Sequence, residues 1–73
     1  EGGASMDDLH KRLSRRIHDL ALKRKLSANK LADFAGIGRG YLSEVLAGKK
    51  SPTVRTLSKI ANALDVTVKA LFE

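Results

Sequence analysis

The sequence contains no cysteine, a single proline, few aromatic residues (4%) and no long apolar run. Without cysteine the chain has no disulfide and no thiolate site for zinc or an iron–sulfur cluster, which fits a reducing, cytoplasmic compartment. The apolar runs are a few residues long, whereas a helix that spans a bilayer needs roughly 20. We expect no signal peptide, because no apolar block follows the basic residues near the start, Lys11, Arg12, Arg15 and Arg16.

The length of 73 residues limits the chain to one small core. A domain of this size buries only about 60% of the surface that its unfolded chain exposes. A catalytic site needs enough surrounding structure to enclose a substrate, which a chain of this size can hardly provide. The sequence also shows no nucleophile–base pair or cluster of metal ligands. His10 and His18 lie eight residues apart without further ligands, which favours a solvated helix face. We therefore expect no enzyme, no metal site and no cofactor.

Basic residues are in excess and are concentrated in the middle of the chain. Lysine and arginine number 14 against 8 acidic residues, for a formal net charge of +6. Between residues 23 and 59, nine basic residues stand against two acidic ones, Asp33 and Glu44, for a local net charge of +7. Such a footprint indicates a polyanionic partner, either nucleic acid or an anionic membrane surface, unless it serves only solubility.

Helical periodicity begins at Met6, after five residues (1–5) that have the look of a vector-derived remnant. Apolar steps of three and four, capping residues and glycine stops predict helices over residues 6–24, 28–35, 39–47, 54–64 and 68–72. The apolar stripe of the first helix begins at Leu9, and that of the fourth begins at Val54. No stretch alternates with a period of two, so we expect an all-α domain over residues 6–73.

A capping residue flanked by apolar residues recurs four times. An apolar residue precedes each cap, and a leucine lies four positions after it. This is the hydrophobic staple, which fixes the angle at which the chain enters a helix, so we expect helices at defined, non-parallel angles. The four sets are Leu26-Ser27-Leu31, Ile37-Gly38-Leu42, Pro52-Thr53-Leu57 and Val66-Thr67-Leu71.

The second and third expected helices are joined by about three residues that include glycine, which is typical of a helix-turn-helix. This geometry needs an apolar anchor and a small residue in the first helix of the pair, and a turn residue that tolerates positive φ. It also needs an apolar plug after the turn and two inward apolar residues in the second helix. The sequence supplies these at Leu31, Ala32, Gly36, Ile37, Leu42 and Val45.

From about Leu13 to Phe72 the chain resembles the phage-repressor-like (Xre/Cro-type, lambda-repressor-like) helix-turn-helix domain. The matching stretches are Leu26-Ser27, Leu31-Ala32, Gly36-Ile37, Tyr41-Leu42-Ser43, Gly48-Lys49, Pro52-Thr53, Thr56-Leu57 and Ala63-Leu64-Asp65-Val66. The resemblance implies a compact five-helix fold whose third helix enters the DNA major groove. It also implies a bacterial or phage transcription regulator that binds an inverted repeat as a dimer.

Two positions depart from the family's pattern. Ala28 stands where the family commonly has a glutamine that contacts the DNA backbone, and Gly38 stands where it commonly has serine or threonine. The first departure leaves only a backbone N–H for a DNA contact at Ala28.

Helical geometry separates two faces of the third helix. If Leu42 and Val45 face the core, the outward positions that would meet base edges are Arg39, Gly40, Ser43 and Glu44. Arg39 lies in the first turn and suits a bidentate pair with guanine. Glu44 either accepts from a cytosine amino group or holds Arg39 or another basic side chain. Gly40 indicates either a close approach of the backbone to DNA or a helix that packing holds anyway.

Phosphate contacts are expected from the starts of the second and fourth helices, where free N–H groups and the helix dipole attract anions, and from the loop after the third helix. Such contacts position the protein without reading sequence and make binding steeply salt-dependent. The expected contact residues are Ser27, Asn29, Lys30, Lys49, Lys50, Thr53 and Arg55.

Other side chains receive less specific predictions. We expect Tyr41 to pack rather than to stack on a base, and Phe34 and Phe72 to be core or subunit-contact residues. We also expect a homodimer, weak or formed on DNA, with an effector domain or partner protein beyond this chain. The first choice for the dimer contact is the chain end, with Val66, Val68, Leu71 and Phe72.

Together these features predict sequence-specific binding of double-stranded DNA by a transcription regulator, a repressor in preference to an activator, on nucleoid DNA. One alternative is a protein-interaction module that kept the fold and lost DNA binding, which Gly38, Gly40 and Glu44 on the reading face favour. A membrane-surface role for the first helix is the other alternative, and the need of its apolar stripe for the core opposes it.

Overall fold

The computed structural model describes residues 6–73, which form four α-helices and one 3-10 helix and contain no strand. This confirms the all-α class. The elements are α1 (Met6–Lys23), α2 (Ala28–Ala35), α3 (Arg39–Leu46), α4 (Val54–Ala63) and the 3-10 helix η1 (Val68–Phe72).

The observed bounds differ little from the predicted ones. The helices expected over residues 6–24, 39–47 and 54–64 each end one residue earlier, and the expected fifth α-helix is the 3-10 helix η1. The predicted vector-derived remnant, residues 1–5, lies outside the described residues. No helix within residues 6–73 combines the length and the apolar character needed to cross a membrane.

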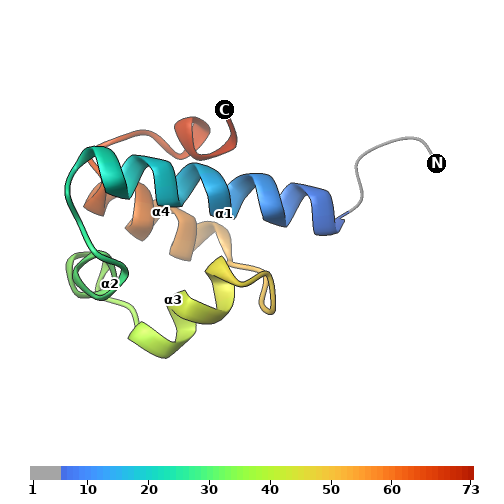
Figure 1. The fold of residues 1–73 in the computed structure, drawn as a ribbon, viewed down its shortest axis with the longest axis horizontal. Coiled ribbons are helices and arrows are strands. Elements are labelled where there is room, and N and C mark those ends of the chain that lie inside the picture. Colours follow the sequence, from blue (N-terminus) through green and yellow to red (C-terminus); the bar gives the residue numbers. More distant parts are fainter. Residues whose placement is uncertain (1–5) are drawn as a thin grey trace.

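Helix α1 runs along the longest dimension of the molecule, with α2 and α3 on one side of it and η1 on the other (Figure 1). Helix α2 contacts both α3 and α4, and η1 contacts both α1 and α4. Each short element is therefore held against two others, and α3 is fixed through α1 and α2.

The core joins all five elements. Burying a leucine or isoleucine side chain stabilises the fold by roughly 1.5–3 kcal/mol. The largest fully buried side chains come from every helix and from the end of α4, so no element can be lost without opening the core. They are Ile17, Leu31, Leu42, Ile60, Leu64 and Leu71.

Three connections between helices share one three-residue design. A residue with positive φ ends a helix, an apolar residue follows, and the next residue caps the next helix. The backbone N–H of the apolar residue donates to a carbonyl five residues back, at 2.9 Å for Leu26 and 3.0 Å for Ile37 and Val66, which is the Schellman motif. The three triplets are Lys25-Leu26-Ser27, Gly36-Ile37-Gly38 and Asp65-Val66-Thr67.

The apolar residue of each triplet serves both helices that it joins. Leu26, Ile37 and Val66 are half-buried and pack on the core, which contains the leucine that follows each cap by four positions. One side chain therefore closes the helix behind it and staples the helix ahead of it. This design fixes the angle between successive helices, as the staple pattern predicted.

The predicted capping residues are confirmed. The side chains of Ser27, Thr53 and Thr67 accept hydrogen bonds from the backbone N–H three residues on, at 3.2, 3.1 and 3.3 Å. Gly36 has a φ of 71°, the left-handed conformation that the turn of a helix-turn-helix was expected to need. Helix α3 begins at Gly38 without a side-chain cap.

Three expectations about apolar residues are wrong, and one of two alternatives for a fourth residue is excluded. Leu9 and Val54, which open the predicted stripes of α1 and α4, lie in the first turns of these helices and are 36% and 75% exposed. Phe34 is 65% exposed, because it lies off the face that α2 turns to the core, so of its two expected roles it does not have the core one, and the subunit contact stays a prediction. Leu71 is fully buried in η1, so it is not available as a subunit contact.

Candidate nucleic-acid interface

Helices α2 and α3 and the turn between them form the predicted helix-turn-helix. Helix α3 buries Leu42 and Val45, at 1% and 2% exposure, as expected from the sequence. Its opposite side carries the predicted base-contact residues, of which Glu44 is half-buried. The exposed members are Arg39, Gly40 and Ser43.

Space around the two glycines of this region is open. A Cβ added at Gly40 would meet no atom within 4 Å, and one added at Gly38 would meet only the Cβ of Tyr41, at 3.9 Å. Packing in the free protein therefore does not require glycine at either position. The exposed backbone of the first turn of α3 is left bare.

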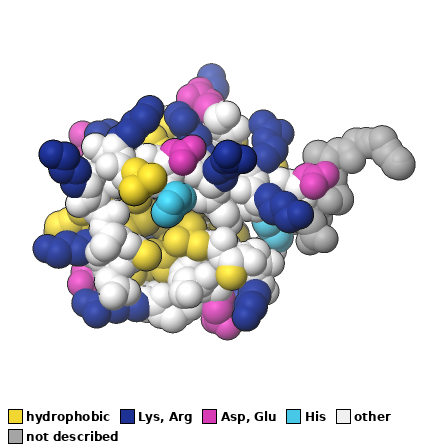
Figure 2. Space-filling view, viewed as in Figure 1, with side chains coloured by type: hydrophobic (Ala, Val, Ile, Leu, Met, Phe, Trp, Pro, Cys, Tyr) yellow, Lys and Arg dark blue, Asp and Glu magenta, His cyan; other side chains and the backbone are white. Residues whose placement is uncertain are grey.

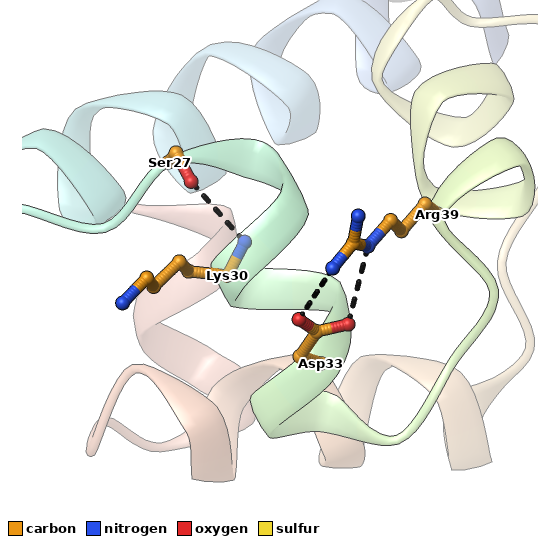
Figure 3. Close-up of polar contacts among 4 residues, drawn as sticks. All are labelled: Ser27, Lys30, Asp33 and Arg39. Atoms are coloured by element: carbon orange, nitrogen blue, oxygen red, sulfur yellow. Dashed lines mark hydrogen bonds and ion pairs between the residues drawn. The ribbon is translucent and has the colours of Figure 1, made fainter.

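Arg39 is paired across the turn with Asp33 of α2 (Figure 3). The Nη2 group of Arg39 donates to Oδ2 of Asp33 at 2.8 Å, and Nε donates to Oδ1 at 3.3 Å. The hydrogen bond from Arg39 lowers the pKa of the Asp33 carboxyl, and the charges of Arg39 and Lys30 lower it further. The same hydrogen bond raises the pKa of Arg39. The spacing of Asp33 and Arg39 in the sequence did not predict this pair.

Glu44 is paired with Lys50, which lies in the loop after α3. Oε1 of Glu44 and Nζ of Lys50 are 3.4 Å apart. Of the two roles predicted for Glu44, the structure therefore shows the one in which it holds a basic side chain, and this side chain is Lys50 rather than Arg39. The same Nζ atom lies 6.0 Å from the centre of the Tyr41 ring, within reach of a cation–π contact. The Tyr41 hydroxyl lies 3.5 Å from Oγ1 of Thr56 on α4, which agrees with the predicted packing role.

The starts of α2 and α4 each expose a capping residue and the first turn of a helix. The Ser27 side chain accepts from the Lys30 N–H, and Lys30 points away from the Asp33–Arg39 pair (Figure 3). The Thr53 hydroxyl donates to Oγ1 of Thr56 at 3.1 Å and is therefore already engaged. The remaining predicted phosphate contacts on these turns and the adjoining loop are exposed: Asn29, Lys49 and Arg55.

Two arginines outside the helix-turn-helix have structural partners. Arg16 donates from Nε to the carbonyl oxygen of Ala70 at 2.8 Å, which ties α1 to η1. Arg24 donates from Nε to the carbonyl oxygen of Leu64 and so joins the ends of α1 and α4. Part of the positive charge in the sequence therefore serves the fold.

The face shown in Figure 2 carries Lys and Arg around its margin and hydrophobic side chains in its middle. A hollow of about 150 Å³ lies between α1, α2 and the end of α3. Its walls are largely apolar, and its rim includes Leu22, which is 61% exposed. His18 lines the hollow, whereas His10 lies 3.1 Å from the Ser51 hydroxyl. Among the side chains that the structure describes, no three His, Asp or Glu residues gather into a possible metal site.

Known proteins with similar sequences are regulators. The chain is 36% identical over 61 residues to the HTH-type transcriptional regulator SutR of Escherichia coli (strain K12), which covers 84% of this chain and 34% of that protein. It is 32% identical over 59 residues to the immunity repressor protein of Bacillus phage phi105. The aligned region covers 81% of this chain and 41% of that protein. The chain thus spans roughly a third to two fifths of the length of these relatives.

Solved structures of regulators have the same fold. The restriction-modification controller protein C.AhdI from Aeromonas hydrophila superposes with a TM-score of 0.83 at 28% identity, over 86% of this chain and 96% of that one. A helix-turn-helix (HTH_3) family transcriptional regulator from Vibrio cholerae superposes with a TM-score of 0.85 at 28% identity, over 93% of this chain and 38% of that one.

The family model that describes helix-turn-helix proteins, HTH_3, matches residues 17–71. This match extends from the middle of α1 to η1 and includes the whole α2–turn–α3 unit. The chain therefore belongs to the HTH_3 helix-turn-helix family.

Proposed function

We propose that this protein is a transcription regulator, a repressor in preference to an activator, that binds double-stranded DNA sequence-specifically through α3. The single observation that carries the proposal is the division of α3 into two faces. Leu42 and Val45 anchor one face in the core, while the other exposes an arginine, a bare glycine and a hydroxyl. A helix held in this way can enter the major groove and present base contacts from Arg39, Gly40, Ser43 and Glu44.

The backbone of the DNA would be held by groups around this helix. The first turns of α2 and α4 offer N–H groups without intrahelical partners, and Thr53 would contribute through its backbone because its hydroxyl is engaged. On DNA binding, the Lys50 side chain would leave Glu44 and contact a phosphate instead. The complete proposed set is Ser27, Asn29, Lys30, Lys49, Lys50, Thr53 and Arg55.

We also propose binding as a homodimer to an inverted repeat, with half-sites about one helical turn apart. The phage relative is an immunity repressor and one structural relative is a restriction-modification controller, which supports a regulator. Phe72 is 41% exposed and lines a hollow together with Leu9 and Pro52, which supports a subunit contact there. Such a regulator would act on nucleoid DNA in the cytoplasm.

A protein-interaction module is the second candidate. The exposed ring of Phe34, on the outside of α2, and the exposed Leu22 favour it, because large apolar side chains at the surface are typical of contacts with other proteins. This candidate needs no contact between α3 and DNA.

Selection from random duplex DNA separates the two candidates. The regulator is expected to enrich a motif with two-fold symmetry, and its affinity for that motif is expected to fall linearly on a log–log plot against salt concentration. The variant Lys49→Ala should weaken binding to all sequences alike and lower the salt slope by about one. Failure to enrich any motif, with binding that vanishes near physiological salt, would exclude the specific regulator and leave the interaction module.

A further inference from the structure

We propose that Asp33 is a positioning residue for DNA reading, which holds the guanidinium of Arg39 so that its outer edge recognises a guanine. The inference rests on the proposed function, because it assigns Asp33 a part in the base contact of Arg39. It adds a residue of α2, outside the recognition helix, to the determinants of sequence preference.

The geometry of the pair leaves the reading edge of the arginine open. Asp33 occupies the edge formed by Nε and Nη2, at 3.3 and 2.8 Å. The adjacent edge, formed by Nη1 and the second N–H of Nη2, makes no hydrogen bond to any of the described residues. Two parallel N–H groups on this edge match O6 and N7 of guanine. The carboxylate and the base can therefore bind the same guanidinium together.

The pair is better suited to orientation than to stability. The side chains of Arg39 and Asp33 are 59% and 56% exposed, and exposed ion pairs add little to the free energy of folding. An arginine side chain has many rotamers, and ordering it on binding has an entropic cost. The two hydrogen bonds that Arg39 donates to the Asp33 carboxylate meet part of this cost before DNA arrives. The planar fork of the guanidinium is then fixed relative to α3.

A competing possibility is that Asp33 restrains Arg39 and opposes binding. In that case the pair must break before Arg39 reaches a base, and removal of Asp33 would strengthen specific binding without loss of preference. A simple charge effect must also be separated, because removing any acidic side chain strengthens binding to DNA of every sequence. The test therefore measures preference for one base rather than affinity alone.

The experiment begins with the DNA motif that the wild-type chain enriches from random duplexes. Arg39→Ala identifies the guanine that Arg39 reads. At that position of the motif, the preference of the protein for guanine over other bases should fall about 5- to 150-fold. If wild type enriches no motif, the proposed function fails and this inference fails with it. If a motif is enriched and Arg39→Ala relaxes no base pair, the function stands and the inference about Asp33 is wrong.

The decisive variant is Asp33→Ala, with Asp19→Ala as the matched control. Asp19 is an exposed acidic residue on α1, so its removal changes the net charge equally. Asp33→Ala should lower the preference for that guanine about two- to tenfold, since one rotamer-rich side chain must then be ordered on binding. Asp19→Ala should leave the preference unchanged. Both should strengthen binding to random duplex alike.

Two further variants complete the test. Asp33→Glu keeps the carboxylate and should restore part of the guanine preference, whereas in an Arg39→Ala background Asp33→Ala should change the preference no further. Thermal unfolding of all variants should stay close to wild type, because an exposed ion pair adds little to stability, and this separates orientation from loss of fold. An unchanged preference in Asp33→Ala, or tighter specific binding than Asp19→Ala produces, would overturn the proposal.

Discussion

Replacing Gly40 by alanine should stabilise the protein and weaken the proposed specific binding to DNA. Gly40 is the second residue of α3 and is exposed, and a Cβ there would meet no atom within 4 Å. Glycine within a helix costs roughly 0.5–1 kcal/mol relative to alanine, chiefly through the entropy of the unfolded chain. For a domain of this size each kcal/mol shifts Tm by about 4–8 °C, so Tm should rise by about 2–8 °C.

The effect on DNA binding tests why glycine stands at this position. Packing in the free protein leaves room for a methyl group at position 40. A requirement for glycine at this position would therefore come from the bound DNA. A base edge or a sugar that approaches the bare backbone of α3 would collide with the added Cβ. We therefore expect affinity for the enriched motif to fall several-fold, while affinity for random duplex stays the same.

The assay pairs thermal unfolding by circular dichroism with competition binding of motif against random duplex. Gly36→Ala is the control, because Gly36 has a φ of 71° and alanine there should cost about 1–2 kcal/mol, which lowers Tm. A lower Tm for Gly40→Ala would refute the open-space reasoning. If Gly40→Ala raises Tm and leaves the preference for the motif unchanged, DNA does not approach the backbone closely at this position. Glycine would then be tolerated there only because packing holds α3 together.

Two other predictions concern backbone strain and pH. Lys25 has a φ of 59°, so Lys25→Gly should remove about 1–2 kcal/mol of strain against roughly 0.5–1 kcal/mol of glycine entropy. A net gain of up to about 1.5 kcal/mol should appear in chemical unfolding. Lys23→Gly, in the last turn of α1, should instead lose stability, and an equal loss in both variants would contradict the prediction. Asp33 has a lowered pKa because of its hydrogen bond from Arg39, so its contribution to stability is present above the ordinary carboxyl pKa and is lost as pH falls through the lowered value. Carboxyl titration by NMR should show that pKa rise in Arg39→Ala, and an unchanged value would exclude the pair in solution.

The features that sequence predicted well are local ones. Caps at Ser27, Thr53 and Thr67 and the left-handed Gly36 act within a few residues of the chain, so their signals are complete in the sequence. The inward pair on α3 follows from helical periodicity alone. These signals were sufficient to place all five helical segments within one residue at each end.

The features that sequence missed depend on the angles between helices. The pair between Arg39 and Asp33 spans a turn, and its formation is decided by how α3 leaves α2 rather than by the spacing of the two residues. Leu71 was expected both as the staple leucine after Thr67 and as a subunit contact, and the packing of η1 against α1 and α4 buries it, which agrees only with the first role. Exposure of Phe34 likewise follows from which face α2 turns to α4.

The charge of the chain is divided between folding and the proposed binding. Arg16 and Arg24 donate to backbone carbonyls that close η1 and α4 onto α1, so they are engaged whether or not DNA is present. Arg39 and Lys50 are each held by an acid, and these two acids, Asp33 and Glu44, are the only ones between residues 23 and 59. The acidic side chains that reduce the positive charge of the helix-turn-helix are thus also the ones that orient its cations. A count of lysine and arginine overstates the phosphate contacts that this domain can make. A better guide is the number of exposed cations that form no ion pair with another described residue, which are Lys30, Lys49 and Arg55 among the proposed contacts.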